Sequence, residues 1–134
     1  QWNLVDNKDL CYHYLGDFDR EMLKVIKSEK NFNKTPVQEI WHNDGDQVLA
    51  YMRGDLLFVF NFSPTKSFTD YGFLVPTGSY SIVLDSDNPA FGGNGLNDDT
   101  MTHLTNYDPV YLEDHKEWLK LYLPARSALV LKKN

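Results

Sequence analysis

The sequence predicts an all-β fold, an antiparallel β-sandwich over residues 34–134 that is preceded by one or two helices within residues 1–33. Apolar residues recur with a period of two from Thr35 onward, whereas before Phe32 they follow a helical period. Turn signals separate the predicted strands at short intervals; they include Asn43-Asp44-Gly45-Asp46, Gly54-Asp55 and Thr77-Gly78. Short strands joined by frequent turns are typical of a sandwich.

The first 33 residues supply the predicted helices. Asp6 or Asp9 can cap a short helical turn that runs to Leu15 and that Gly16 closes. A second helix then begins near Asp17, because carboxylates favour a helix N-terminus. Its apolar face consists of Phe18, Met22, Val25 and Ile26. We expect this face to be only partly covered within the chain itself.

One predicted strand, Leu56–Phe62, is apolar on nearly both of its faces. Such a strand belongs in the centre of a sheet that is covered on both sides. Phe58 and Phe60 on this strand are therefore expected in the core, together with Leu84 and Leu121. The remaining strands are predicted at 37–41, 48–53, 73–75, 80–84, 118–123 and 127–132, with a polar loop at 64–72 and a long Gly/Asn/Asp loop at 85–99.

The composition argues against several classes of partner. The formal net charge is -6 at pH 7 and the lysines are scattered, whereas nucleic acid requires clustered basic residues. No apolar run approaches the roughly 18 residues of a membrane span. Cys11 is the only cysteine, so neither an internal disulfide nor a multi-thiolate zinc site is expected. A free thiol fits a reducing compartment and hence a cytoplasmic location.

No cofactor and no metal site are predicted. The histidines lack the i, i+4 spacing of a helical zinc site; they are His13, His42, His103 and His115. Asp85-Ser86-Asp87 resembles the start of a calcium loop, but Ala90 and Leu96 stand where an EF-hand needs glycine and a bidentate acid. We therefore expect Asp85 and Asp87 to accept backbone N–H bonds in the turn after a strand.

The glycine-rich segment Gly92-Gly93-Asn94-Gly95 lacks the Lys-Ser/Thr that follows in a phosphate loop. It is expected to supply positive φ angles in a tight loop instead. Two acidic pairs, Asp98-Asp99 and Glu113-Asp114, are the candidates for glycoside hydrolysis. Neighbouring acids in an extended segment point apart, so we interpret both pairs as solvated loop charges. No catalytic residue is predicted.

Aromatic side chains could stack on sugar rings, and the candidates are Trp2, Trp41, Trp118, Tyr71 and Tyr107. Trp41 and Trp118 occupy predicted strand positions, which favours core packing for both. Trp2 heads the chain, where it would face a neighbouring part of a longer protein, and it is retained as the one candidate carbohydrate-binding residue.

Blocks of residues along nearly the whole chain resemble the C-terminal part of 1,4-α-glucan (glycogen) branching enzymes of the α-amylase superfamily. The blocks are Gln1-Trp2-Asn3-Leu4-Val5-Asp6, Leu10 through Met22, Arg53 through Phe62, Pro64-Thr65-Lys66-Ser67, Asp70-Tyr71, Val83-Leu84-Asp85-Ser86-Asp87, Phe91-Gly92-Gly93-Asn94-Gly95 and Leu123-Pro124-Ala125-Arg126-Ser127-Ala128. Two departures stand out. Ser63 replaces a histidine common in the family, and residues 106–115 replace a longer loop.

The resemblance implies an α-amylase C-terminal β-sandwich in residues 34–134, with residues 1–33 as the helical end of a (β/α)8 catalytic barrel. It further implies that the parent enzyme cleaves α-1,4-glucan and forms α-1,6 branches by retaining transglycosylation. The catalytic groups then lie upstream of Gln1, and this chain alone is inactive. Its expected partners are the barrel of the same polypeptide and an α-glucan. Two alternatives stay open, an independent carbohydrate-binding module and a stand-alone β-sandwich enzyme.

Overall fold

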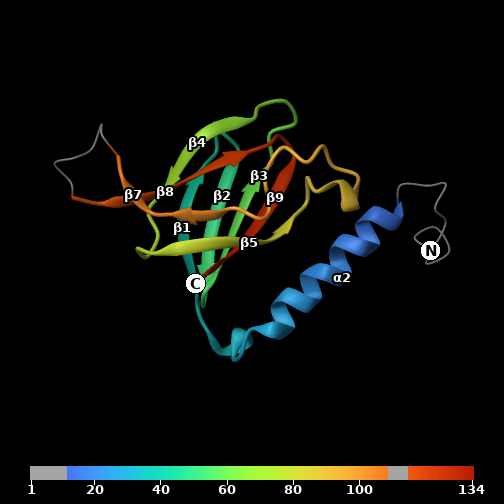
Figure 1. The fold of residues 1–134 in the computed structure, drawn as a ribbon, viewed down its shortest axis with the longest axis horizontal. Helices are drawn as coiled ribbons and strands as arrows, with labels where there is room; N and C mark the ends of the chain where they lie inside the picture. The colour runs from blue at the N-terminus through green and yellow to red at the C-terminus, as the bar shows by residue number, and fades with distance from the viewer. Residues whose placement is uncertain (1–11, 109–114) are drawn as a thin grey trace.

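Two antiparallel β-sheets and one α-helix make up the computed structural model, which describes residues 12–108 and 115–134 (Figure 1). The larger sheet has six strands in the order β1-β2-β3-β9-β5-β6, and the smaller has three in the order β4-β8-β7. The strands are β1 (Val37–Asn43), β2 (Val48–Arg53), β3 (Leu56–Asn61), β4 (Phe68–Phe73), β5 (Ser79–Asp85), β6 (Thr102–Leu104), β7 (Asn106–Tyr107), β8 (Glu117–Leu123) and β9 (Ser127–Lys133). The predicted all-β fold with an N-terminal helix is confirmed.

Strand β3 explains how the larger sheet is covered on both faces. All of its residues except Phe60 are buried, and it lies between β2 and β9 in the sheet. Leu57 and Val59 point into the core that the two sheets share, which also receives Leu121 from β8. Leu56 and Phe58 point to the opposite face, where helix α2 packs. Because strand side chains alternate between faces, a strand covered on both sides must be apolar throughout.

Helix α2 (Tyr12–Ser28) crosses the outer face of the larger sheet (Figure 1). Phe18, Met22 and Val25 pack against the cluster formed by the buried residues Leu56, Phe58, Leu84 and Val130. At the end of the helix, the Glu29 carboxylate lies 2.8 Å from the Lys132 ammonium on β9. Phe18, Met22 and Ile26 are each only half-buried, so the expected partial cover of this helix face is confirmed.

Helix α2 runs without a break through Gly16, so the predicted end of a first helical turn at that residue is wrong. An interior glycine costs a helix only about 1 kcal/mol relative to alanine. Tertiary packing offsets this cost, because Phe18, two residues after Gly16, packs edge-to-face on Phe91. The suggested caps Asp6 and Asp9 lie outside the described residues.

Three further predictions need correction. Phe60 is half-buried rather than in the core, although Phe58, Leu84 and Leu121 are buried as expected. Strand β4 occupies much of the predicted polar loop 64–72, because its outward-facing residues are polar while Phe73 and Phe68 pack inward. The short strands β6 and β7 fall in a segment where no strand was predicted.

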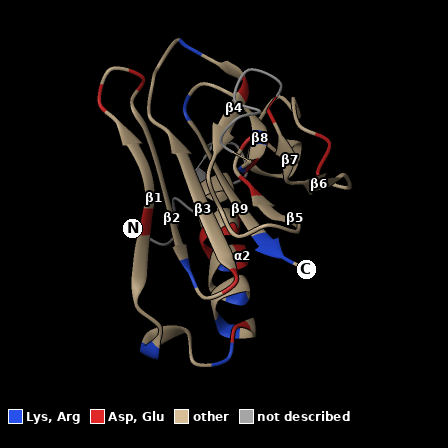
Figure 2. Cartoon of the chain, turned by 90° about the vertical axis from the view of Figure 1, so that its left-hand side faces the viewer, with Lys and Arg blue, Asp and Glu red and all other residues tan. Residues whose placement is uncertain are grey.

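Charged residues of the described chain are dispersed over turns, strand ends and helix α2 (Figure 2). Among the same residues, no helix has both the length and the apolar character that a bilayer crossing requires.

Candidate functional site

The turn after β5 uses two carboxylates to hold its own backbone. Asp85 Oδ1 accepts a hydrogen bond of 2.8 Å from the Asp87 N–H. Asp87 in turn accepts bonds of 3.0 Å from the Asn94 N–H and 3.1 Å from the Leu96 N–H. The prediction that Asp85 and Asp87 bind backbone N–H groups is therefore confirmed. Across the described residues, no group of three or more His, Cys, Asp or Glu side chains is placed to hold a metal ion.

The glycines of this loop have two different tasks. Gly92 and Gly95 adopt positive φ angles of 82° and 64°, as predicted. Gly93 is needed for space instead, because a Cβ atom there would lie 2.1 Å from the backbone oxygen of Asp87. The loop thus folds back directly onto the turn that Asp87 holds.

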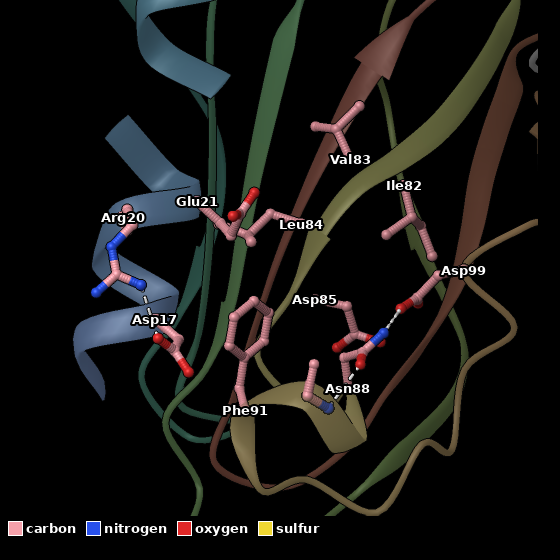
Figure 3. Close-up of a pocket in the computed structure, with 11 residues that line it drawn as sticks. Asp17, Arg20, Glu21, Ile82, Val83, Leu84, Asp85, Asn88, Phe91 and Asp99 are labelled. Atoms are coloured by element: carbon pink, nitrogen blue, oxygen red, sulfur yellow. Dashed lines mark hydrogen bonds and ion pairs between the residues drawn. The ribbon is translucent and has the colours of Figure 1, made fainter. Parts of the chain in front are cut away.

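Asp85 and Asp99 face each other in a pocket of about 480 Å³ between helix α2 and strand β5 (Figure 3). Asp85 is only 2% exposed, and Asn88 Nδ2 donates a bond of 2.8 Å to Asp99 Oδ2. Burial, and then the hydrogen bond with Asp99, raises the pKa of Asp85 to about 7. The two carboxyl groups of a retaining glycosidase stand about 5–5.5 Å apart across the substrate bond. Asp85 Oδ2 and Asp99 Oδ1 are instead both buried without another hydrogen-bond partner, so a proton shared between the two carboxyl groups would satisfy both atoms.

The acidic pairs named from the sequence do not form a catalytic constellation. Asp98 is exposed and accepts bonds from the Thr100 N–H and hydroxyl, which lower its pKa. Its neighbour Asp99 turns inward to Asn88 and Asp85, so the two adjacent acids do point apart. Glu113 and Asp114 lie outside the described residues.

The raised pKa of Asp85 predicts a specific pH dependence of stability. Unfolded Asp85 ionises near pH 3.8, whereas folded Asp85 keeps its proton until about pH 7, so its contribution to stability is full below pH 3.8 and declines up to about pH 7. Asp85→Asn keeps a neutral side chain and removes this decline. The unfolding free energy of Asp85→Asn minus that of the parent should rise by at most about 4 kcal/mol between pH 4 and pH 8.

Urea denaturation at several pH values measures this difference. Asp98→Asn is the matched control. The pKa of Asp98 is lowered in the folded chain, so ionised Asp98 favours the folded state. The Asp98→Asn difference should therefore fall as the pH rises from acid. A difference for Asp85→Asn that does not change with pH would rule out a proton held between Asp85 and Asp99.

Three of the five candidate aromatic residues meet in one groove of about 660 Å³ beside the smaller sheet. Its apolar lining, which we call the aromatic groove, consists of Trp41 from β1, Phe68 and Tyr71 from β4, Leu74, and Trp118 from β8. The same groove is also lined by four charged residues, Asp70, Asp108, Lys116 and Lys120. The Lys120 ammonium lies 2.9 Å from the Asp108 carboxylate.

Trp41 is held in place by a chain of hydrogen bonds. Its indole Nε1–H donates to Tyr71 Oη at 3.0 Å, and the Tyr71 hydroxyl donates to Asp46 Oδ2 at 2.9 Å. Burial raises the pKa of Tyr71, so the hydroxyl stays protonated as this chain requires. Trp41 is nevertheless 45% exposed, so its predicted place in the core is wrong; Trp118 is half-buried.

Trp41 is exposed because β1 is the edge strand of the larger sheet. The register between β1 and β2 shifts between Glu39 and Trp41, and that between β4 and β8 shifts between Phe68 and Tyr71. The shift in β1 places Trp41 opposite Ala50, which is in the core, so Trp41 lies on the core-facing side of the sheet at its open edge. Tyr107 lies on β7 outside the groove lining and is 55% exposed, and Trp2 lies outside the described residues.

The sequence did not indicate Asp46 or the charged groups of the groove, since only the folded sheets bring them to the aromatic residues.

This chain is similar to one family of domains and to several 1,4-alpha-glucan-branching enzymes. Residues 40–134 match the model of the family described as alpha amylase, C-terminal all-beta domain. The chain is 38% identical over 133 residues to a 1,4-alpha-glucan-branching enzyme of Saccharomyces cerevisiae, covering 98% of this chain and 18% of the relative. It is 39% identical to one from Emericella nidulans (98% and 19%) and 37% identical to one from Dictyostelium discoideum (99% and 20%). The chain thus spans about a fifth of the length of these relatives. It belongs to the family of alpha amylase C-terminal all-beta domains.

Proposed function

We propose that this chain is the non-catalytic C-terminal domain of a 1,4-α-glucan branching enzyme. One observation carries the proposal. Nearly the whole chain aligns with branching enzymes at 37–39% identity, yet it accounts for only 18–20% of their length. The remaining four-fifths of such a protein offers ample room for a (β/α)8 barrel, which takes about 250 residues. The parent enzyme would act in glycogen synthesis, in the cytoplasm, with no dedicated cofactor.

The chemistry assigned to the parent enzyme is retaining transglycosylation. A carboxylate displaces the α-1,4-linked leaving chain, whose oxygen takes a proton from the acid/base residue. The covalent glycosyl ester is then opened by a 6-hydroxyl, which returns its proton to the same residue. Both groups are assigned to the barrel. Several acids of the described residues support this assignment, because Asp85 holds a turn, Asp108 and Glu29 form ion pairs, and Asp99 faces Asp85.

The barrel is also the proposed partner of helix α2. Leu15 and Leu23 on this helix are 61% and 54% exposed, and Phe62, which follows β3, is 58% exposed. Leu15 and Phe62 line a shallow pocket of about 710 Å³ with Phe18, Phe60 and Phe91. Exposed apolar surface of this kind marks an interaction site. Cover by the barrel would make this domain a stabilising support for the catalytic part.

The isolated 134-residue chain is expected to be catalytically silent. Incubation with amylose should change neither the iodine stain nor the number of reducing ends, because the described residues place no nucleophile and acid/base on opposite sides of a sugar site. An active branching enzyme serves as the positive control. Activity that survives repurification and disappears on substitution of Asp98, Asp99, Glu113 or Asp114 would overturn the proposal and favour a stand-alone enzyme.

A second candidate function is an independent carbohydrate-binding module. The aromatic groove is the observation in its favour, because it presents Trp41 and Tyr71 at the surface beside charged groups. The two functions are compatible, since a domain that supports a barrel can also hold its substrate.

A further inference from the structure

We propose that the aromatic groove is a binding site for an α-1,4-glucan chain, with the indole of Trp41 as its stacking platform. That the groove takes a neutral sugar follows from its own geometry and charge. That the sugar is an α-glucan rests on the proposed function.

The first argument is the way in which Trp41 is presented. An indole that is 45% exposed would be free to rotate, but the bond from its Nε1 to Tyr71 Oη, itself bonded to Asp46, fixes its plane. The polar edge of the ring is thereby occupied within the protein, and the apolar faces remain for a ligand. A platform fixed in advance loses little conformational entropy on binding.

The second argument is the irregular backbone on both sides of the groove. The pairing of β1 shifts just before Trp41, and the pairing of β4 shifts just before Tyr71. Asp70, at the second irregularity, has a φ of 51°, which is rare for a residue other than glycine. Two local distortions that aim aromatic side chains at the same space are unusual in a purely structural edge, because bulges and strained residues cluster at functional sites.

The third argument is the charge of the groove. Asp70 and Asp108 are balanced by Lys116 and Lys120, so the groove offers hydrogen-bond acceptors and donors without a net charge. Sugar hydroxyls both donate and accept, and they suit such a mixed set of groups. A polyanion would meet two carboxylates, and a purely apolar ligand would displace water from the charged groups. The volume of about 660 Å³ lies within the range of small-molecule sites.

Maltoheptaose titrated into the 134-residue chain tests the site. The two sheets enclose a hydrophobic core of their own, so we expect the 134-residue chain to fold by itself and to be usable in this titration. Saturable binding is expected, with a shift of the Trp41 indole N–H resonance in a nitrogen–proton NMR spectrum. Trp41→Ala should weaken binding at least tenfold, and Trp41→Phe should restore part of the loss because it keeps an aromatic ring.

The matched control is Tyr107→Ala, which removes a comparably exposed aromatic ring that lies outside the groove lining and should leave the affinity unchanged. Thermal unfolding of each variant verifies that the fold is intact. Maltoheptaose binding that Trp41→Ala leaves unchanged, or no binding by the parent chain up to millimolar sugar, would overturn the proposed site. Stronger binding of cellohexaose would overturn the α-glucan assignment. None of these results bears on the domain assignment, which the gene upstream of Gln1 tests separately.

Discussion

Replacing Phe58 by alanine is expected to destabilise the chain by about 3–5 kcal/mol, because a buried phenylalanine is lost where the helix meets the sheet. Phe58 is 3% exposed. Its ring stacks on Tyr51 at 4.9 Å and meets Phe32 edge-to-face at 6.3 Å. The cavity left by alanine cannot close easily, since β3 is fixed by β2 and β9 on either side. Urea denaturation followed by circular dichroism gives the loss directly.

Phe62→Ala is the matched control for this prediction. It removes the same side chain four residues further along, at a position that is 58% exposed. We expect it to change stability by less than about 1 kcal/mol, as is usual for surface substitutions. Equal losses for Phe58→Ala and Phe62→Ala would show that helix α2 does not seal this face of the sheet.

Gly93→Ala is the second substitution with a large expected effect, on the order of 3–5 kcal/mol from backbone strain together with lost hydrogen bonds. The new Cβ would lie 2.1 Å from the backbone oxygen of Asp87, and backbone atoms cannot rotate away as a side chain can. The loop must therefore move, which strains its backbone and breaks the bonds from the Asn94 and Leu96 N–H groups to Asp87. Thermal and urea unfolding would report the loss.

Gly45→Ala provides the comparison for Gly93→Ala. A Cβ at Gly45 would meet only the side-chain oxygen of Asn43, at 3.3 Å, and a small shift relieves that contact. It should cost less than about 1 kcal/mol. If Gly93→Ala were as mild as Gly45→Ala, the close return of the loop onto Asp87 would be incorrect.

Strands whose burial is decided locally could be predicted from the sequence. The segment that became β3 is apolar at successive positions, and only a central strand covered on both faces suits that pattern. Strand β4 was not predicted because its exposed residues Thr69 and Asp70 are polar and its pairing is irregular, so the segment resembles a loop. The predicted helix end at Gly16 was wrong because glycine's local tendency to end a helix was outweighed by the packing of Phe18 on Phe91.

The same distinction applies to the candidate sites. Asp85 and Asp87 were predictable because their hydrogen-bond partners lie within a few residues along the same turn. The aromatic groove was not predictable, because it joins β1, β4 and β8 and depends on two register shifts. The strand position of Trp41 favoured the core, whereas β1 is the edge strand of its sheet and leaves this side chain exposed.

The most direct test of the central claim is the sequence of the gene upstream of the codon for Gln1. If this chain is the C-terminal domain of a branching enzyme, an open reading frame continues upstream in frame and encodes a (β/α)8 barrel with the catalytic carboxylates. A stop codon in frame directly before Gln1, or an upstream region that encodes no barrel, would contradict the account.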